Sequence, residues 1–135
     1  MKRNPSNIVE GQFSAYFAAA AAAVYQEYNW DSYQKLQDQK VKALMKVTTS
    51  HPDPELERFG SRIDIKMKDG RVLSRDVPLA TGEPERFLRW EDEVLKFNSM
   101  AEPVLGVSRA RLVVESIADM ENINDLSLFT SMLRV

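Results

Sequence analysis

The stretch that decides the fold runs from Arg62 to Leu105 and reads RIDIKMKDGRVLSRDVPLATGEPERFLRWEDEVLKFNSMAEPVL. It predicts a β-hairpin, then an ordered loop, then a helix. In its first part Ile63, Ile65 and Met67 alternate with charged residues. Strict period-two alternation is typical of a strand with one buried face and one face in water, so we expect one side of the hairpin to be covered.

The turn between the two strands sets their register. A two-residue loop at Asp69-Gly70 would place apolar side chains opposite polar ones. A three-residue loop over residues 68–70, with a left-handed glycine and a bulge, instead sets Ile65 against Leu73 and Ser61 against Val77. We therefore predict a hairpin over residues 61–79 in this second register.

A helix is predicted to begin near Trp90. Trp90, Val94 and Phe97, with either Met100 or Ala101, recur at helical spacing and predict one apolar face. Three acidic residues follow directly in the first turn, where the helix dipole favours negative charge. We expect Pro103 and Gly106 to end this helix.

Composition limits the classes of protein to consider. The chain has 135 residues, 44% hydrophobic and 28% charged, which fits one domain over 1–135 with enough apolar material for a core. The net charge of -2, without a basic stripe, argues against nucleic acid and an anionic membrane as partners. No cysteine is present, which excludes disulfides, thiolate metal sites and a cysteine nucleophile, and suits the reducing cytoplasm.

The first half of the chain predicts two helices and a strand. Residues 13–25, FSAYFAAAAAAVY, are too short for a membrane span, and Glu10 and the run of alanines argue against a signal peptide. Six consecutive alanines instead favour a helix that lets neighbours approach closely. Asp31 with Gln34 resembles the capping box of a second helix. That helix is expected to give way to a strand near 46–51, because residues 47–49 are β-branched and prolines follow.

Two more helices are expected at the C-terminal end. Ser108 is a candidate cap for a helix over 109–120 whose buried stripe consists of Leu112, Val113 and Ile117. Asn124 or Asp125 can cap a final short helix. Its apolar residues recur at three- and four-residue intervals, so this last face needs a partner: Leu126, Phe129, Met132 and Leu133.

Few residues carry recognisable chemistry. His51 is the single histidine, and no Ser-His-Asp pattern or second histidine accompanies it, so a surface or strand-end role is favoured over a functional one. Arg86, in the loop TGEPERFL, can hold a carboxylate, or it can be a solvated loop cation. No nucleotide-binding or hydrolase motif and no carboxylate cluster at metal spacing is present. The residue pattern alone predicts an α+β domain, with helices flanking a small antiparallel sheet, and no self-contained active site.

Several segments together resemble the C-terminal part of the MmgE/PrpD family, which includes 2-methylcitrate dehydratase, cis-aconitate decarboxylase and iminodisuccinate epimerase. They are GQFSAYFAAAAAAV, IKMKDGRVLSRDV, TGEPERFL, the closing SRARLVVESIADMENINDLSLF and, most specifically, WEDEVLKFNSMAEPVLG. The resemblance covers about Pro5 to Leu133. It implies that the hairpin and its flanking helices belong to the small α+β domain of such proteins, and that their N-terminal helical catalytic domain is absent here.

The resemblance also implies a chemistry and candidate residues. Family members act without metal or cofactor, by acid-base chemistry at a carbon next to carboxylates, in a cleft between two domains. They commonly read FSLPY where this chain reads FSAYF. Matching Ser14 to the motif serine puts Phe17 at the tyrosine position and Tyr16 one place early, a rotation of about 100° on a helix. Tyr16 and Ser14 are thus the catalytic candidates and Arg86 the substrate-binding candidate.

Two functions follow as hypotheses. In the first, the chain is the C-terminal domain or a fragment of an enzyme of this lyase and isomerase family, inactive alone, partnered by the missing helical domain or a second subunit, with a small carboxylate ligand. In the second, it is a homo-oligomeric binding or assembly module that kept the fold and lost the chemistry. A self-sufficient enzyme ranks third, because too few groups are available as general acid and base.

Overall fold

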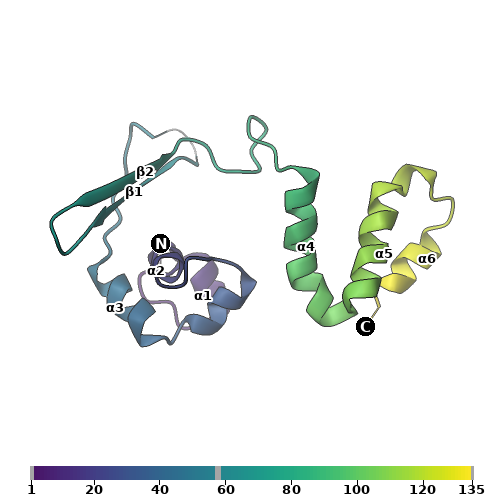
Figure 1. Cartoon of the computed structure of the whole chain (residues 1–135), viewed down its shortest axis with the longest axis horizontal. Coiled ribbons are helices and arrows are strands. Elements are labelled where there is room, and N and C mark those ends of the chain that lie inside the picture. The colour runs from purple at the N-terminus through teal and green to yellow at the C-terminus, as the bar shows by residue number, and fades with distance from the viewer. Residues whose placement is uncertain (1, 57–58, 135) are drawn as a thin grey trace. The chain divides into compact units, whose positions relative to one another are not determined.

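The computed structural model describes residues 2–56 and 59–134, and it divides into two compact units, Met1–Pro54 and Glu55–Val135 (Figure 1). The predicted α+β class is confirmed, while the single domain over 1–135 stays a prediction. In chain order the elements are α1 (Ile8–Gln12), α2 (Ala15–Tyr25), the 3-10 helix η1 (Trp30–Lys35), α3 (Gln39–Val47), β1 (Ser61–Lys66), β2 (Val72–Val77), α4 (Trp90–Leu105), α5 (Val107–Ala118), the 3-10 helix η2 (Met120–Asn122) and α6 (Leu126–Met132).

The core of the first unit lies where α2 packs against α3. The alanine-rich helix is confirmed, and its alanines allow the close approach that the sequence predicts. Leu36, which follows η1, and Val41 and Met45 of α3 fill the space beside them. The buried hydrophobic residues of this core are Phe17, Ala20, Ala21, Leu36, Val41 and Met45.

An aromatic cluster closes one side of this core. The Phe17 ring lies 5.9 Å from the Tyr33 ring and 6.2 Å from the Tyr28 ring, measured between centroids. The hydroxyl of Tyr28 donates to the hydroxyl of Tyr33 at 3.0 Å. Burial, followed by this hydrogen bond, raises the pKa of Tyr28. Such ring contacts add stability beyond the area they bury.

The predicted strand near 46–51 is wrong. Helix α3 continues to Val47, and residues 48–51 have no regular structure. The hydroxyl of Thr48 donates to the carbonyl of Leu44 at 2.9 Å, and the Thr48 amide donates to the same carbonyl at 3.1 Å. Both bonds tie Thr48 to the preceding helical turn, so helix formation overrides the β propensity of this segment. His51 lies in the irregular segment and is exposed, as expected.

The helix start predicted at Asp31 is also wrong. The segment from Trp30 forms the 3-10 helix η1, and the capping box is made by Asn29 with Ser32. The α-helix begins later, where a carboxylate oxygen of Asp38 accepts from the amides of residues 40 and 41 at 2.7 and 3.1 Å. The α-helix therefore starts after its N-cap Asp38, several residues later than the start predicted at Asp31.

The hairpin register is confirmed. Ser61 pairs with Val77 and Ile65 with Leu73, as the three-residue loop requires. The amide of Met67 donates to the Arg71 carbonyl at 2.8 Å across the loop. Gly70 takes a φ of 89°, which L side chains adopt only under strain.

The expectation that one hairpin face is buried is not met. Every residue of β1 is exposed, with Ile65 at 42%, and of β2 only Val77 is half-buried. Among the described residues, β1 and β2 form a sheet of two strands only. The pattern predicts which side chains share a face, but it does not supply the surface that would cover them.

Helices α4, α5 and α6 follow one another along the second unit. The predicted start at Trp90 and the end at Gly106 are confirmed, while Pro103 lies inside the last turn. Val94, Phe97 and Ala101 are half-buried, whereas Trp90 and Met100 are exposed. The predicted apolar face is therefore covered only toward its middle.

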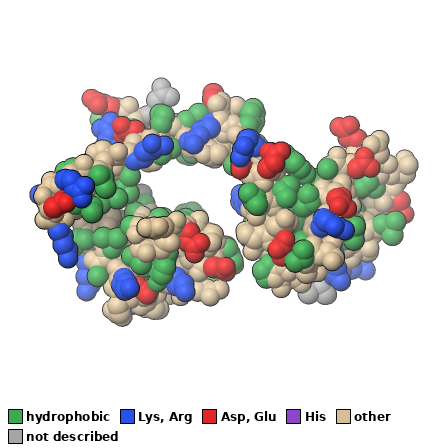
Figure 2. All heavy atoms as spheres, viewed as in Figure 1, with side chains coloured by type: hydrophobic (Ala, Val, Ile, Leu, Met, Phe, Trp, Pro, Cys, Tyr) green, Lys and Arg blue, Asp and Glu red, His purple; other side chains and the backbone are tan. Residues whose placement is uncertain are grey.

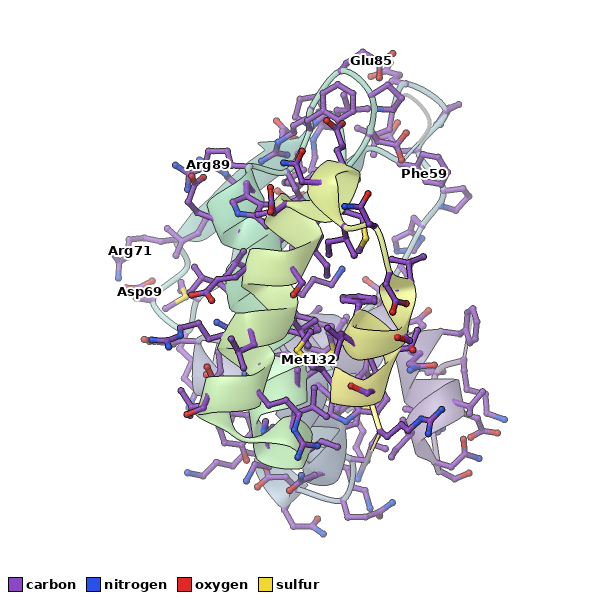
Figure 3. All side chains as sticks on the ribbon, turned by 90° about the vertical axis from the view of Figure 1, so that its right-hand side faces the viewer. Phe59, Asp69, Arg71, Glu85, Arg89 and Met132 are labelled. Carbon is purple, nitrogen blue, oxygen red and sulfur yellow. The ribbon has the colours of Figure 1, made fainter. Side chains whose placement is uncertain are left out.

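In α5 the buried residues are Ala110 and Val113, while Leu112 and Ile117 are exposed, so only one of the three predicted stripe residues is buried. The predicted cap of α6 is confirmed, because the Asp125 carboxylate accepts from the Ser127 amide at 2.8 Å. Met132 of α6 points toward α5 (Figure 3). α5 itself begins after Gly106, which leaves the predicted cap Ser108 inside the first turn.

Candidate functional site

Ser14 serves as the N-cap of α2. Its side chain is buried, at 2% exposure, and its hydroxyl oxygen accepts from the Phe17 amide at 3.1 Å. An N-cap satisfies an amide that the helix leaves unpaired. The first catalytic candidate therefore has a structural role at the start of the helix.

Tyr16 lies at the surface of the same helix, beside a cation. It is half-buried, and the guanidinium carbon of Arg3 lies 5.4 Å from the centre of its ring. The same guanidinium donates to the carbonyls of Lys46 and Thr48, both at 3.4 Å. Arg3 thus bridges the start of α2 and the C-terminal end of α3, where the helix dipole favours a positive charge.

Phe17, which the motif resemblance sets at the position of the tyrosine, points into the core and is fully buried. Tyr16 and Phe17 therefore lie on different sides of α2, as a step of one residue on a helix requires. A side chain at position 17 reaches the aromatic cluster of its own unit. A side chain at position 16 is the one of these two that a second molecule can contact.

Arg86 braces its own loop. One guanidinium nitrogen donates to the Leu79 carbonyl at 2.7 Å, and the loop closes through backbone hydrogen bonds of 2.8 Å from Gly82 to Arg86 and from Arg86 to Glu83. Gly82 takes a φ of 103°, which only glycine adopts without strain. The side chain is exposed at the surface of the second unit. The structure therefore places Ser14 and Tyr16 in one unit and Arg86 in the other.

A basic groove in the first unit is a feature that the sequence reasoning missed. Its volume is about 540 Å³, and its lining includes Lys42 and Lys46 but no acidic residue. Figure 2 shows basic side chains among hydrophobic ones on the surface of this unit. The signal that could have found it is the spacing of the two lysines, four residues apart on a helix, which places them on one face.

The lining of the groove contains both polar and apolar side chains. Asn4, Gln37 and Gln39 supply amide groups, while Leu36 and Met45 supply apolar surface. The ammonium of Lys42 donates to the side-chain carbonyl of Gln37. A second groove of about 490 Å³ lies along residues 6–9 and 33–37. The linings of these two grooves do not include Tyr16, Ser14 or Arg86.

Glu10 ties the N-terminal segment to α1. Its carboxylate accepts from the Ser6 amide at 2.7 Å and from the Ser6 hydroxyl at 2.9 Å, and it pairs with the Lys2 ammonium at 3.0 Å. The hydrogen bond from the Ser6 amide, then that from Lys2, lowers the pKa of Glu10 to about 2. This carboxylate stays ionised and holds its partners rather than exchanging a proton near neutrality.

Within residues 2–56 and 59–134, no group of three or more acidic, histidine or cysteine side chains is placed to hold a metal ion. No helix in the described part of the chain is both long and apolar enough to cross a membrane.

A family model described as the MmgE/PrpD C-terminal domain matches residues 1–122. This match spans both structural units and includes Ser14, Tyr16 and Arg86. A comparison with curated proteins finds no match.

Proposed function

The chain belongs to the MmgE/PrpD family, and on this premise we propose that it is the C-terminal domain or a fragment of an enzyme that acts on a small di- or tricarboxylate such as 2-methylcitrate. The reaction is of the lyase or isomerase class: loss of water, decarboxylation or epimerisation. The chain is inactive alone, and a helical domain on another polypeptide segment supplies most of the acid-base groups. The absence of cysteine supports a cytoplasmic location.

The observation that carries this proposal is the family match over residues 1–122. The scarcity of acid-base groups supports it: the single histidine, His51, is exposed in an irregular segment. General acid-base catalysis needs a donor and an acceptor within reach of one substrate carbon. In this proposal the partner supplies at least one of them.

Tyr16 is the residue through which this chain contributes to the cleft. Its ring is half-buried, and Arg3 lies over it. A phenol beside a guanidinium suits a carboxylate ligand, since the hydroxyl can move a proton while the cation attracts the anion. Arg86 is the substrate-binding candidate of the second unit, on a loop that its bond to the Leu79 carbonyl holds in place.

The test is complementation in trans. The purified chain and the purified helical domain of a family member are assayed separately and together, with 2-methylcitrate or cis-aconitate as substrate. We expect turnover only in the mixture, and a loss of about 10²-fold or more when Tyr16→Phe removes an acid-base group. Tyr28→Phe is the matched control, because it also removes a hydroxyl from the first unit, but that hydroxyl donates to Tyr33 and Arg3 does not lie over its ring. Turnover by the chain alone, or a mixture without turnover, would overturn the proposal.

A second candidate function is a homo-oligomeric binding or assembly module. The observation that favours it is the exposed apolar surface of the second unit. Ile63, Ile65 and Leu73 of the hairpin are exposed at 43%, 42% and 52%, and Leu128 of α6 at 73%. Exposed apolar side chains that share a face, as those of Ile65 and Leu73 do, favour an interaction site over a surface that faces water.

A further inference from the structure

The hairpin has an apolar face that the described residues of its own unit leave exposed. Because Ile65 pairs with Leu73 and Ser61 with Val77, the side chains of Ile63, Ile65 and Met67 share a face with Leu73. These four are exposed by 37% to 52%. A two-stranded hairpin alone is marginally stable in water and gains most from further strands or a covering surface.

The hairpin also has two open edges, since the described sheet contains only β1 and β2. The Met67 amide bonds to the Arg71 carbonyl, so every second residue back along β1 also bonds inward to β2. The backbone groups of Asp64 and Lys66 therefore point to the outer edge of β1. An exposed strand edge is a template for pairing with another strand.

The charges on β1 favour pairing with a second copy of itself. In an antiparallel pair centred on Ile65, each Asp64 lies opposite the Lys66 of the other copy, so two pairs of opposite charge form. On the apolar face, Ile65 meets its own copy and Ile63 meets Met67. Cross-strand pairs of these kinds each stabilise a sheet.

Other registers on β1 fit less well. A pair centred on Asp64 would set that carboxylate against its own copy and Arg62 against Lys66. The pair centred on Ile65 does set Arg62 opposite Lys68, but Arg62 is already paired with Asp76, at 2.6 Å between Nε and Oδ1. Like charges directly opposite each other destabilise a strand pair. A pair centred on Ile63 would set Arg62 opposite Asp64, but it would also set Ile65 opposite Ser61 and leave it without an apolar partner. The register centred on Ile65 matches the apolar residues with one another as well as Asp64 with Lys66, so it is preferred.

The edge of β2 is less suited to self-pairing. Centring two copies of β2 on Arg75 would oppose the two guanidiniums, and centring them on Leu73 would oppose Arg71 and Arg75. Centring them on Ser74 would set Leu73 against Arg75. Each of these registers places like charges together or wastes the apolar face.

We propose that two copies of this chain associate through antiparallel pairing of their β1 strands about a two-fold axis at Ile65, forming a four-stranded sheet in the order β2-β1-β1-β2. The interface is isologous and therefore closes at two copies rather than extending into a filament. This inference rests on the second, self-associating candidate function and not on the enzymatic one.

Cysteine cross-linking tests the axis directly, because the natural chain contains no cysteine. Residue 65 opposes its own copy in a non-hydrogen-bonded pair, where Cα atoms are closest and a disulfide can form. Ile63→Cys is the matched control: it lies on the same face with a similar exposure of 43% against 42%, but the two copies of residue 63 lie roughly 13 Å apart along the strands. We expect Ile65→Cys to form covalent dimer about tenfold faster than Ile63→Cys under mild oxidation.

Charge reversal tests the register. Asp64→Lys alone turns two attractive pairs into two repulsive ones, and we expect the dimer dissociation constant to rise about tenfold in analytical ultracentrifugation. The double variant Asp64→Lys, Lys66→Asp restores opposite charges and is expected to return the constant to within about threefold of the natural chain. Far-UV circular dichroism on each variant checks that the chain is folded.

Each outcome of these experiments either supports or overturns the proposed interface. Cross-linking at position 65 but not 63, with rescue by the double variant, supports the interface. A dimer that cross-links equally at both positions, or at neither, overturns this interface and leaves the self-associating function standing. A chain that is monomeric at all accessible concentrations overturns both, while the enzymatic proposal is untouched because complementation in trans tests it separately.

Discussion

The amide of Phe17 donates to the hydroxyl oxygen of Ser14 at 3.1 Å, and this bond joins a candidate catalytic residue to the centre of the hydrophobic core. Ser14 caps α2, and Phe17 is the first large side chain of that helix to be fully buried. The FSAYF segment is therefore held in place by its own unit.

Replacement of Ser14 separates the capping role from catalysis. Ser14→Ala is expected to lower the free energy of unfolding by about 1 kcal/mol, because an amide at the start of α2 loses its acceptor. Ser14→Gly also removes the hydroxyl, but glycine at an N-cap lowers the free energy of unfolding by only roughly a few tenths of a kcal/mol. Urea unfolding checks the stabilities. If Ser14→Gly is stable yet fails in the complementation assay, Ser14 acts in catalysis as well as in capping.

Phe17 should be far more important for stability than its neighbour. Phe17→Ala is expected to cost about 3–5 kcal/mol, since it removes a fully buried ring from the aromatic cluster. Tyr16→Ala should cost less than Phe17→Ala, because the Tyr16 ring is only half-buried. Both are measured by urea unfolding. Equal losses in the two variants would contradict the packing described for α2.

Restoring the family tyrosine at position 17 is expected to be unfavourable. Phe17→Tyr places a hydroxyl in a fully buried position, which costs about 1–3 kcal/mol when the hydroxyl finds no partner. The same urea experiment measures it. A stable Phe17→Tyr variant would mean that the core opens toward a polar group at this position, and that the family arrangement is accessible to this chain.

Replacing Gly70 by alanine should destabilise the hairpin more than replacing it by asparagine. Its φ is 89°, and no atom lies within 4 Å of the position that a Cβ would take, so the cost of a side chain is conformational rather than steric. Gly70→Ala is expected to destabilise the hairpin by about 1 kcal/mol, while Gly70→Asn should cost less. Hydrogen exchange of the strand amides measures the effect locally. Equal protection in both variants would contradict the left-handed turn.

Glu10 should make stability depend on acidity. Its pKa in the folded chain is lowered from 4.5 to about 2, so its contribution is present above pH 4.5 and is lost as the pH falls through about 2. Glu10→Gln should therefore be less stable than the natural chain near pH 6, with the difference shrinking on acidification. Urea unfolding across this range is the measurement. Glu27→Gln is the control, because it makes the same substitution at an exposed carboxylate of the first unit.

The parts of the fold that could be predicted are those set by local chemistry. The pairing of Ser61 with Val77 follows from alternation and one glycine, because a shift by one residue would move every side chain to the other face. The start of the helix at Trp90 follows from its spacing and acidic first turn. The strand near 46–51 failed because propensity is a weak guide where a cap as good as Asp38 starts a helix that runs to Val47.

For the candidate site, the sequence predicted that Tyr16 stands one residue before the motif position, but it did not predict where the side chains of residues 16 and 17 lie. A helical step of one residue separates Tyr16 from Phe17, and the structure turns Phe17 into the core and sets Tyr16 beside Arg3. Arg3 contacts the carbonyls of Lys46 and Thr48, which lie 43 and 45 positions further along the chain, and no local sequence pattern reveals such a contact. The basic groove was missed for the same reason, since its lining comes from the N-terminal segment and from α3.

By itself the sequence determined the class of the domain, the register of the hairpin, the alanine-rich helix and membership in the family, because each depends on the order of nearby residues or on motifs read along the chain. Only the tertiary structure decided which side chains are buried. It placed Phe17 inside and left Ile65 and Leu112 exposed, although all three are apolar. The physical reason is that burial depends on which other surface is present, and an apolar residue carries no information about that surface.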